Sequence, residues 1–304
     1  MDKIQVFSDS HFPIDIKTKK IINFIEEQNK NNSEILFLLW DILDWENTEK
    51  FKNLWEKSLD ILKELSKTYK KIVYVLWNHE FRDPNLQDEG WYKNFREILP
   101  ENIIFPKNIT EPTKVEVEIT KWKILNILVW NLFYDMKFLN PSILWMKKEE
   151  ILNIYKKFPD WNYLFNWDIE IFKKMKKSII EQLDTNIDIL ATHSLPHPSL
   201  VQFLYNWKDI EEFKNKVWKN IKVKSPSDRH YKDAKKLWIS IEEYIKWYNA
   251  KSFFMWSNVL DNPEKIKNWL LSIFWHSHRN TNQKIEVKWK EVNFYSNQYP
   301  NCKG

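Results

Sequence analysis

The sequence predicts an α/β protein whose strands form a largely parallel sheet buried on both faces. Two observations support this fold class. Short, continuously apolar runs such as Ile35–Leu39 lack the polar alternation of a half-exposed strand, and amphipathic helical stretches such as Lys17–Asn29 separate them. The chain has 304 residues, of which 43% are hydrophobic, so it can bury a substantial core.

The expected elements alternate in the first half and include hairpins in the second. They are a strand at Lys3–Phe7, a helix at Lys17–Asn29, a strand at Ile35–Leu39, a helix at Glu49–Tyr69, a strand at Lys71–Leu76, a hairpin of Lys114–Thr120 with Lys123–Val129, strands at Ile187–Ala191 and Leu270–Phe274, and a hairpin of Lys284–Lys288 with Glu291–Tyr295. Residues 138–185 and 200–255 are rich in Lys and helical in period. We interpret them as helical insertions, which would form a cap, in one domain spanning residues 1–304.

Charge and cysteine content restrict the class of protein. The net charge of +5 is mild, and the Lys residues are spread along the chain, which is only a weak indication of polyanionic partners such as nucleic acid. Cys302 is the single cysteine, so internal disulfides are excluded. Residues 1–8 are typical of a strand rather than a signal peptide, and no apolar run reaches about 18 residues. We therefore expect a cytoplasmic protein without a membrane partner.

Glycine and tryptophan occur in unusual numbers. The chain has 2 Gly and 18 Trp, whereas an ordinary protein of this size has about 21 Gly. Turns, helix C-caps and close backbone approaches favour glycine, and two glycines can hardly supply them.

Five of the expected strands are followed directly by residue types that bind metals. These segments are Ser8-Asp9-Ser10-His11, Trp40-Asp41-Ile42-Leu43-Asp44-Trp45, Trp77-Asn78-His79-Glu80, Thr192-His193-Ser194 and Trp275-His276-Ser277-His278. One such pair would be weak evidence, because a lone His is more often a core or surface residue. Ligands bind at the carboxyl ends of strands in open α/β sheets, so the five segments are predicted to converge on one site.

This ordered set of motifs resembles that of the calcineurin-like metallophosphoesterase superfamily. The family pattern is D-x-H, G-D-x-x-D-G, G-N-H-[DE], a lone His and G-H-x-H. The present chain departs from it only where Trp replaces Gly, at Trp40, Trp45, Trp77 and Trp275. The resemblance spans nearly the whole chain.

The resemblance implies a four-layer α/β/β/α sandwich that hydrolyses a phosphomonoester or phosphodiester with two divalent metal ions, Mn²⁺, iron (Fe²⁺ or Fe³⁺) or Zn²⁺. One ion would be held by Asp9, His11, Asp41 and His278, and the other by Asp41, Asn78, His193 and His276. Metal-activated hydroxide would attack phosphorus in line. His79 would protonate the leaving oxygen or stabilise the transition state, and Asp44 would orient His79.

The replaced glycines suggest a reason for the composition. Some bacterial lineages read the UGA stop codon as glycine and other codes read it as tryptophan, so translation with the wrong table would turn Gly into Trp. Glycine positions outside the motifs should then also carry Trp. Trp122 and Trp289 fall in expected hairpin turns, and Trp238 follows a helical run, where φ > 0 is favoured. Trp91, beside Gly90, can be authentic.

Four further residues are weaker candidates for substrate binding. Arg82 can reach a substrate phosphate or form a surface salt bridge. His197 can contact substrate or have only a structural role in its loop. Arg229 and His230 can bind phosphate or simply begin a solvated helix.

Two alternative functions remain open from the sequence. The first is a nuclease acting on nucleic acid, suggested by the basic balance and the insertions. The second is a non-catalytic scaffold on the same fold, against which the complete set of ligand residues argues. The resemblance implies a phosphorylated substrate but gives no oligomeric state.

Overall fold

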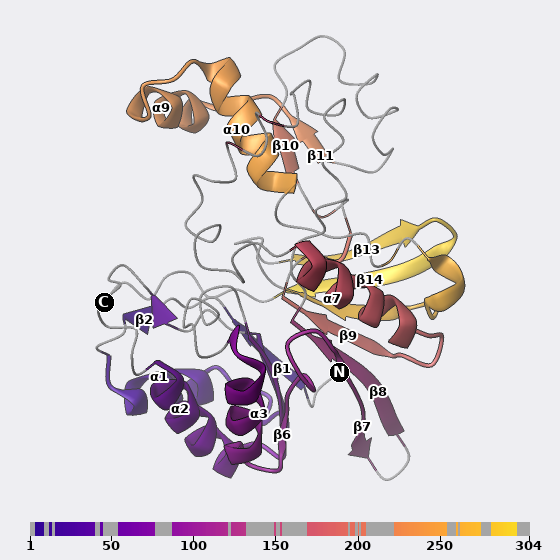
Figure 1. Cartoon of the computed structure of the whole chain (residues 1–304). Coiled ribbons are helices and arrows are strands. Elements are labelled where there is room, and N and C mark those ends of the chain that lie inside the picture. The colour runs from indigo at the N-terminus through magenta and orange to yellow at the C-terminus, as the bar shows by residue number, and fades with distance from the viewer. Residues whose placement is uncertain are drawn as a thin grey trace.

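The protein is a mixed α/β structure with two principal sheets (Figure 1). The computed structural model describes residues 4–8, 12–13, 16–39, 43–44, 54–76, 87–120, 123–131, 149, 153, 169–193, 195–197, 200, 202–204, 222–253, 260, 262–274 and 281–296. No helix in these ranges is long and apolar enough to cross a membrane.

The first sheet has four strands in the order β1-β3-β5-β6, and all of its pairs are parallel. Its strands are β1 (Ile4–Ser8), β3 (Ile35–Leu39), β5 (Lys71–Val75) and β6 (Ile103–Ile104). Every residue of β3 is buried, as expected for a strand that is covered on both faces. The parallel pairing predicted from the continuous apolar runs is confirmed for this sheet.

Three helices accompany this sheet: α1 (Thr18–Glu27), α2 (Leu54–Thr68) and α3 (Glu89–Ile98). Helix α1 buries Ile21 and Ile25, which are one turn apart and so lie on the same face. The Phe24 ring of α1 meets the Phe7 ring of β1 edge-on at 6.0 Å between centroids. The Asp88 side chain caps α3 by accepting a hydrogen bond from the Trp91 backbone N–H at 2.8 Å.

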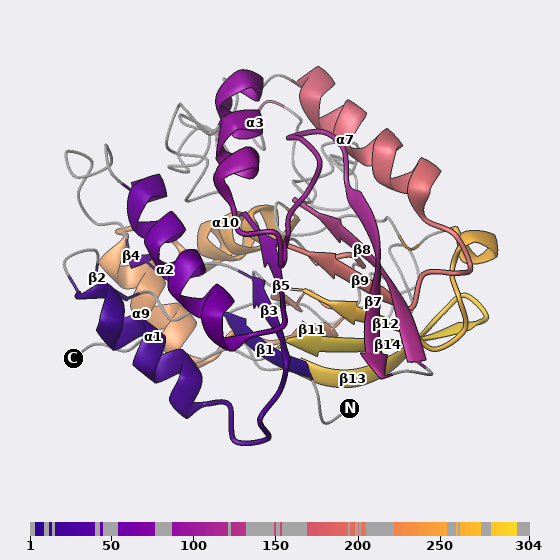
Figure 2. The same ribbon diagram turned by 90° about the horizontal axis from the view of Figure 1, so that it is seen from below.

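The second sheet has six strands in the order β13-β14-β12-β9-β8-β7. Its members are β7 (Thr113–Thr120), β8 (Lys123–Trp130), β9 (Ile189–Thr192), β12 (Leu270–Ile273), β13 (Thr281–Val287) and β14 (Lys290–Ser296). The four central strands are parallel, and the two edge strands pair antiparallel as hairpin partners. Both hairpins expected from the sequence are confirmed. Helix α7 (Ile169–Gln182) lies beside this sheet, and Figure 2 shows the two sheets between α7 and the pair α1 and α2.

The two sheets pack face to face through a shared hydrophobic core. Val6, Phe37 and Val73 of the four-stranded sheet are buried in one cluster with apolar side chains of the six-stranded sheet. These partners are Val117, Ile127, Val129, Ile189, Ala191 and Ile273. Neighbouring strand residues point the other way, because side chains alternate along a strand. Tyr74, for example, stacks on Phe105 at 5.3 Å on the side of α3.

A smaller unit lies apart from both sheets (Figure 1). It consists of strands β10 (Gln202–Leu204) and β11 (Lys222–Lys224) with helices α9 (Asp228–Lys236) and α10 (Ile241–Phe253). Leu204, Ala234 and Tyr244 form its buried core. The interval 200–255, expected to be helical, therefore also contains a parallel strand pair.

Three tryptophans in turns are more than half exposed: Trp238 at 94%, Trp289 at 68% and Trp269 at 55%. Trp238 and Trp269 have φ values of 55° and 70°, in the left-handed region that favours glycine. The conformation predicted after the helix is thus confirmed at Trp238. The prediction for Trp289 is wrong in position, because the turn is Lys288-Trp289 and the positive φ of 56° falls on Lys288. Trp122 lies outside the described residues.

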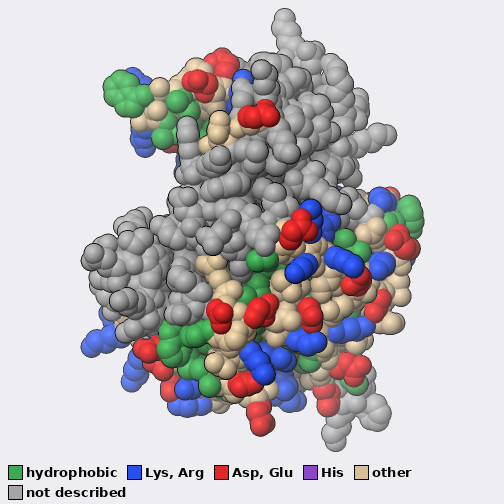
Figure 3. Space-filling model, viewed as in Figure 1, with side chains coloured by type: hydrophobic (Ala, Val, Ile, Leu, Met, Phe, Trp, Pro, Cys, Tyr) green, Lys and Arg blue, Asp and Glu red, His purple; other side chains and the backbone are tan. Residues whose placement is uncertain are grey.

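Charged side chains of both signs are interspersed over the face of the two-sheet body that Figure 3 shows. Most of the described ion pairs are exposed; the pair of Lys67 with Glu64 at 2.6 Å is typical. Pairs of this kind contribute little to stability.

Candidate metal centre

The carboxyl ends of three strands lie level at one edge of the four-stranded sheet. Ser8 of β1 pairs with Leu39 of β3, and Leu39 pairs with Val75 of β5. In the chain, Asp9 follows Ser8 and the segment Trp40-Asp41 follows Leu39. Leu76 and the segment 77–80 follow Val75 in the same way. The strand register therefore begins three of the five predicted ligand segments at the same edge.

A second pairing draws the first two of these segments together again. Strand β2 (Phe12–Pro13) runs parallel to β4 (Leu43–Asp44), with Phe12 opposite Leu43. Residues 9–11 link β1 to β2, and residues 40–42 link β3 to β4. Both links have three residues, and the strands before and after them are paired with each other. This short β2–β4 pair is what places the backbone of Asp44 next to the segment that follows His11.

The six-stranded sheet has a corresponding edge. Trp130, the last residue of β8, pairs with Thr192, the last residue of β9. Ala191 pairs with Ile273, the last residue of β12. His193 follows Thr192 directly and is buried, with 2% of its surface exposed. The segment 275–278 follows one residue after β12 ends. The two remaining ligand segments therefore begin together as well.

A hydrogen bond between the sheets joins the two edges. The backbone N–H of Leu76, just past β5, donates to Oδ1 of Asn131, just past β8, over 3.0 Å. The carboxyl ends of β5 and β8 are thus in direct contact. The described ends of the strands that precede the five predicted segments therefore lie along two edges that this hydrogen bond connects.

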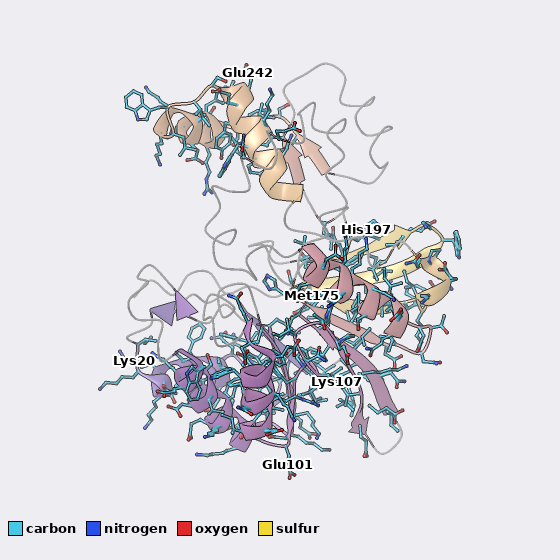
Figure 4. All side chains as sticks on the ribbon, viewed as in Figure 1. Lys20, Glu101, Lys107, Met175, His197 and Glu242 are labelled. Carbon is cyan, nitrogen blue, oxygen red and sulfur yellow. The ribbon has the colours of Figure 1, made fainter. Side chains whose placement is uncertain are left out.

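His197, the weaker candidate four residues after His193, is buried beside β14. Its ring lies 6.4 Å from the Phe294 ring between centroids, and burial lowers the pKa of His197 to about 4. Its imidazole is therefore neutral near pH 7. Figure 4 shows His197 on the side of the six-stranded sheet that faces the smaller unit.

Arg229 and His230 lie in the first turn of α9, away from both sheets (Figure 1). The Arg229 side chain is 88% exposed, with Nε 3.8 Å from a carboxylate oxygen of Asp233. The His230 ring is buried, and its Nδ1 accepts a hydrogen bond from the Ser227 backbone N–H at 2.8 Å. The Tyr248 ring meets the His230 ring edge-on at 5.5 Å. The His230 side chain thus caps the N-terminus of α9.

Most of the predicted site residues lie outside the described part of the chain. They are Asp9, His11, Asp41, Asn78, His79, Arg82, His276 and His278. Of Asp44 only the backbone is described. Within the described ranges, no three His, Cys, Asp or Glu side chains are grouped closely enough to hold a metal ion.

Two residues near this region were not predicted from the sequence as site residues. Asn131 and Tyr92 are both fully buried, and Nδ2 of Asn131 donates to the Tyr92 hydroxyl over 3.0 Å. The only signal for Asn131 is that a polar residue follows an apolar strand, as Asn78 does after β5. Nothing in the sequence connects Asn131 with Leu76, which lies 55 residues earlier.

Comparison with known proteins adds no family to this description. No family model matches the chain, and no curated protein matches it.

Proposed function

We propose that this protein is a phosphoesterase that uses two divalent metal ions, built as a four-layer α/β/β/α metallophosphoesterase sandwich in one domain. The observation that carries the proposal is the register of the strands. The described ends of β1, β3 and β5 lie level, those of β8, β9 and β12 lie level, and the Leu76–Asn131 hydrogen bond joins the two edges. Each of the five motif segments follows one of these strand ends in the chain.

The residue types of these segments fit a pair of divalent ions. Carboxylate, imidazole and amide oxygen groups are ligands that Mn²⁺, iron and Zn²⁺ accept. The proposed ligands combine these groups: Asp9, His11, Asp41, Asn78, His193, His276 and His278. Consecutive Cα atoms are about 3.8 Å apart, so Asp9, Asp41 and His193, which are one or two positions past their strand ends, cannot start far from these edges. The other four ligands follow three to five positions past a strand end. His193, the described member of the set, is buried at this edge.

The metal ions and the residues of the chain would then have separate roles in hydrolysis. When bound, the two ions would act as Lewis acids toward phosphoryl oxygens and would lower the pKa of water toward neutrality. Asp41 would serve both metal positions. His79 would give a proton to the leaving oxygen, and Asp44 would keep the His79 ring oriented.

We infer further that the cell makes this chain with glycine at Trp40, Trp45, Trp77 and Trp275. The left-handed backbone at Trp238 and Trp269 supports this inference, because non-glycine residues rarely adopt it.

Two measurements test the glycine inference directly. Peptide mass spectrometry of the native protein should give glycine masses at these positions, and the codons at 40, 77 and 275 should be UGA. UGG codons, or tryptophan masses, would refute it.

The proposed activity is tested with the full chain that carries Trp40→Gly, Trp45→Gly, Trp77→Gly and Trp275→Gly, which we call the glycine-restored chain. Titration calorimetry should give two bound Mn²⁺ per chain, and hydrolysis of p-nitrophenyl phosphate or bis(p-nitrophenyl) phosphate should require Mn²⁺. Asp41→Asn should lower kcat/KM by more than the roughly 10- to 100-fold typical of outer-shell partners.

Asp184→Asn is the matched control. Asp184 is an exposed carboxylate whose Oδ2 pairs with Nζ of Lys114 at 2.6 Å, so its loss should leave hydrolysis unchanged. If the chain binds two Mn²⁺ and Asp41→Asn hydrolyses as fast as the parent, the mechanism is wrong. Mn²⁺ binding without hydrolysis of either ester would favour a scaffold.

A further inference from the structure

A buried chain of hydrogen bonds crosses between the two sheets at the edge just described. Asn131 Oδ1 accepts from the Leu76 backbone N–H (3.0 Å), and Asn131 Nδ2 donates to the Tyr92 hydroxyl (3.0 Å). The Tyr92 hydroxyl in turn donates to the carbonyl oxygen of Pro106 (3.3 Å). Asn131 and Tyr92 have no exposed surface, and Leu76 is 1% exposed. A polar chain therefore connects β8, the exit of β5 and helix α3 inside the protein.

Each link of this chain has a defined direction. The Leu76 backbone nitrogen can only donate, so the amide oxygen of Asn131 must face it, and the amide nitrogen must face Tyr92. The Tyr92 hydroxyl accepts that hydrogen bond and donates its own proton to a hydrogen bond with the Pro106 carbonyl oxygen. Burial raises the pKa of Tyr92 well above its usual value, so this proton stays in place. The amide of Asn131 is thus held in one orientation.

The hydrogen bond to Leu76 is the functionally relevant part of this hydrogen-bond network because of where Leu76 lies. Strand β5 ends at Val75, and Leu76 is the first residue beyond the strand. A buried backbone N–H at this point needs a partner, and a side chain from the other sheet provides it. Leu76 directly precedes the segment Trp77-Asn78-His79-Glu80. The side chain of Asn131 therefore holds Leu76, the residue that directly precedes this segment in the chain.

We propose that Asn131 is a positioning residue that holds the segment bearing Asn78 and His79 against the edge that carries His193. Asn131 follows Trp130, which pairs with Thr192, the neighbour of His193. One side chain thus ties the origin of one ligand segment to the origin of another on a different sheet. This inference rests on the proposed phosphoesterase function.

The test compares Asn131→Ala with Asn249→Ala in the glycine-restored chain. Asn249 is a close match, because it is also buried and its side chain bonds a backbone N–H, that of Leu204, over 2.8 Å. It lies in the smaller unit, so its loss should destabilise the protein without moving the site. Mn²⁺ affinity is measured by titration calorimetry, kcat/KM with bis(p-nitrophenyl) phosphate, and stability by thermal unfolding without metal.

Asn131→Ala should raise the Kd for Mn²⁺ and lower kcat/KM by about 10-fold or more each, as loss of an outer-shell partner does. Asn249→Ala should keep both values within twofold of the parent although its Tm falls. Tyr92→Phe keeps the bond to Leu76 and removes only one hydroxyl; it should fold and raise the Kd by a smaller factor than Asn131→Ala. If Asn131→Ala does not fold, a Tyr92→Phe chain whose Kd equals that of the parent overturns the proposal.

The outcomes separate this inference from the proposed function. Unchanged Mn²⁺ affinity and kcat/KM in Asn131→Ala, in a parent chain that is active, would overturn the positioning role and leave the function standing. Equal losses in Asn131→Ala and Asn249→Ala would also overturn it, because they would reflect general destabilisation. A parent chain that neither binds Mn²⁺ nor hydrolyses either ester would refute the function, and the positioning role with it.

Discussion

Replacing Trp238 by glycine should make the protein more stable, although the substitution removes a whole indole side chain. Helix α9 ends in a Schellman motif, in which the backbone N–H of Ile239 donates to the Ala234 carbonyl and that of Trp238 to the Lys235 carbonyl, each over 3.2 Å. The motif requires a left-handed residue at Trp238, and the observed φ is 55°. Glycine is the residue that adopts this conformation without strain.

The size of the effect follows from three contributions. Left-handed backbone costs a non-glycine residue about 1–2 kcal/mol, which the substitution would recover. The Trp238 side chain is 94% exposed, so its removal sacrifices little buried area, worth less than about 0.5 kcal/mol. Glycine makes the unfolded chain more flexible, which costs about 0.4–1 kcal/mol. The conformational term is the largest, and the net gain should be somewhat under about 1 kcal/mol.

Urea unfolding followed by far-ultraviolet circular dichroism measures this change. Tryptophan fluorescence is unsuitable because the substitution removes a fluorophore. The midpoint should rise at constant slope, by a few tenths of a molar for a slope of about 3 kcal/mol per molar.

Trp238→Ala is the control at the same site. It removes the ring but retains the Cβ atom, so it keeps the strain and should gain nothing. Trp289→Gly is the control at a second exposed turn, where φ is not positive; it should be neutral or slightly destabilising. A Trp238→Gly protein that is less stable than Trp238→Ala would refute the reasoning.

Three further predictions concern other parts of the molecule. The pKa of His197 is about 4 in the folded chain and 6.5 in the unfolded chain, so between these pH values only the unfolded chain binds the extra proton. The free energy of unfolding should therefore be highest above pH 6.5 and should fall by about 2 kcal/mol by pH 5. Urea titrations of His197→Gln should lack this pH dependence. Asn249→Ala leaves the buried N–H and C=O of Leu204 without that side chain and should cost about 1–3 kcal/mol of unfolding free energy. Mn²⁺ at 100 times its Kd for each of the two sites should raise the thermal midpoint of the glycine-restored chain by an amount equivalent to about 2.7 kcal/mol per ion, or about 5.4 kcal/mol for both, and EDTA should reverse it.

The strands were the most predictable part of the fold because their signal is local. Five consecutive apolar residues predict β3 with the observed bounds, Ile35–Leu39. Helix α1 was expected to reach Asn29 but ends at Glu27, since the Asn29 side chain accepts from the Ser33 backbone N–H at 2.6 Å. Such local side-chain bonds compete with the helix, and helical periodicity does not reveal them.

Contacts between distant segments were beyond the reach of sequence patterns. Helix α3, with buried Tyr92 and Phe95, was not predicted although Asp88 is a typical N-cap residue. The Tyr92 hydroxyl of this helix accepts a hydrogen bond from Asn131, just past a strand of the other sheet, a contact that no local pattern in the sequence indicates. The motifs predict a set of site residues, most of which lie outside the described part of the chain, whereas the hydrogen bond that joins the two edges depends on how the sheets pack.

The location of the proposed site does not depend on whether Trp or Gly occupies the motif positions. Trp40, Trp45, Trp77 and Trp275 all lie outside the described strands, and the register that aligns the strand ends is set by buried apolar residues such as Phe37. Exchanging these four residues therefore leaves the origins of the ligand segments where they are. What glycine would change is how closely the backbone of those segments can approach an ion or a phosphate, because a Cβ atom is absent. The printed chain should accordingly fold with the same strand pairing but bind Mn²⁺ more weakly than the glycine-restored chain, and equal affinity would show that the four glycines are not needed for the site.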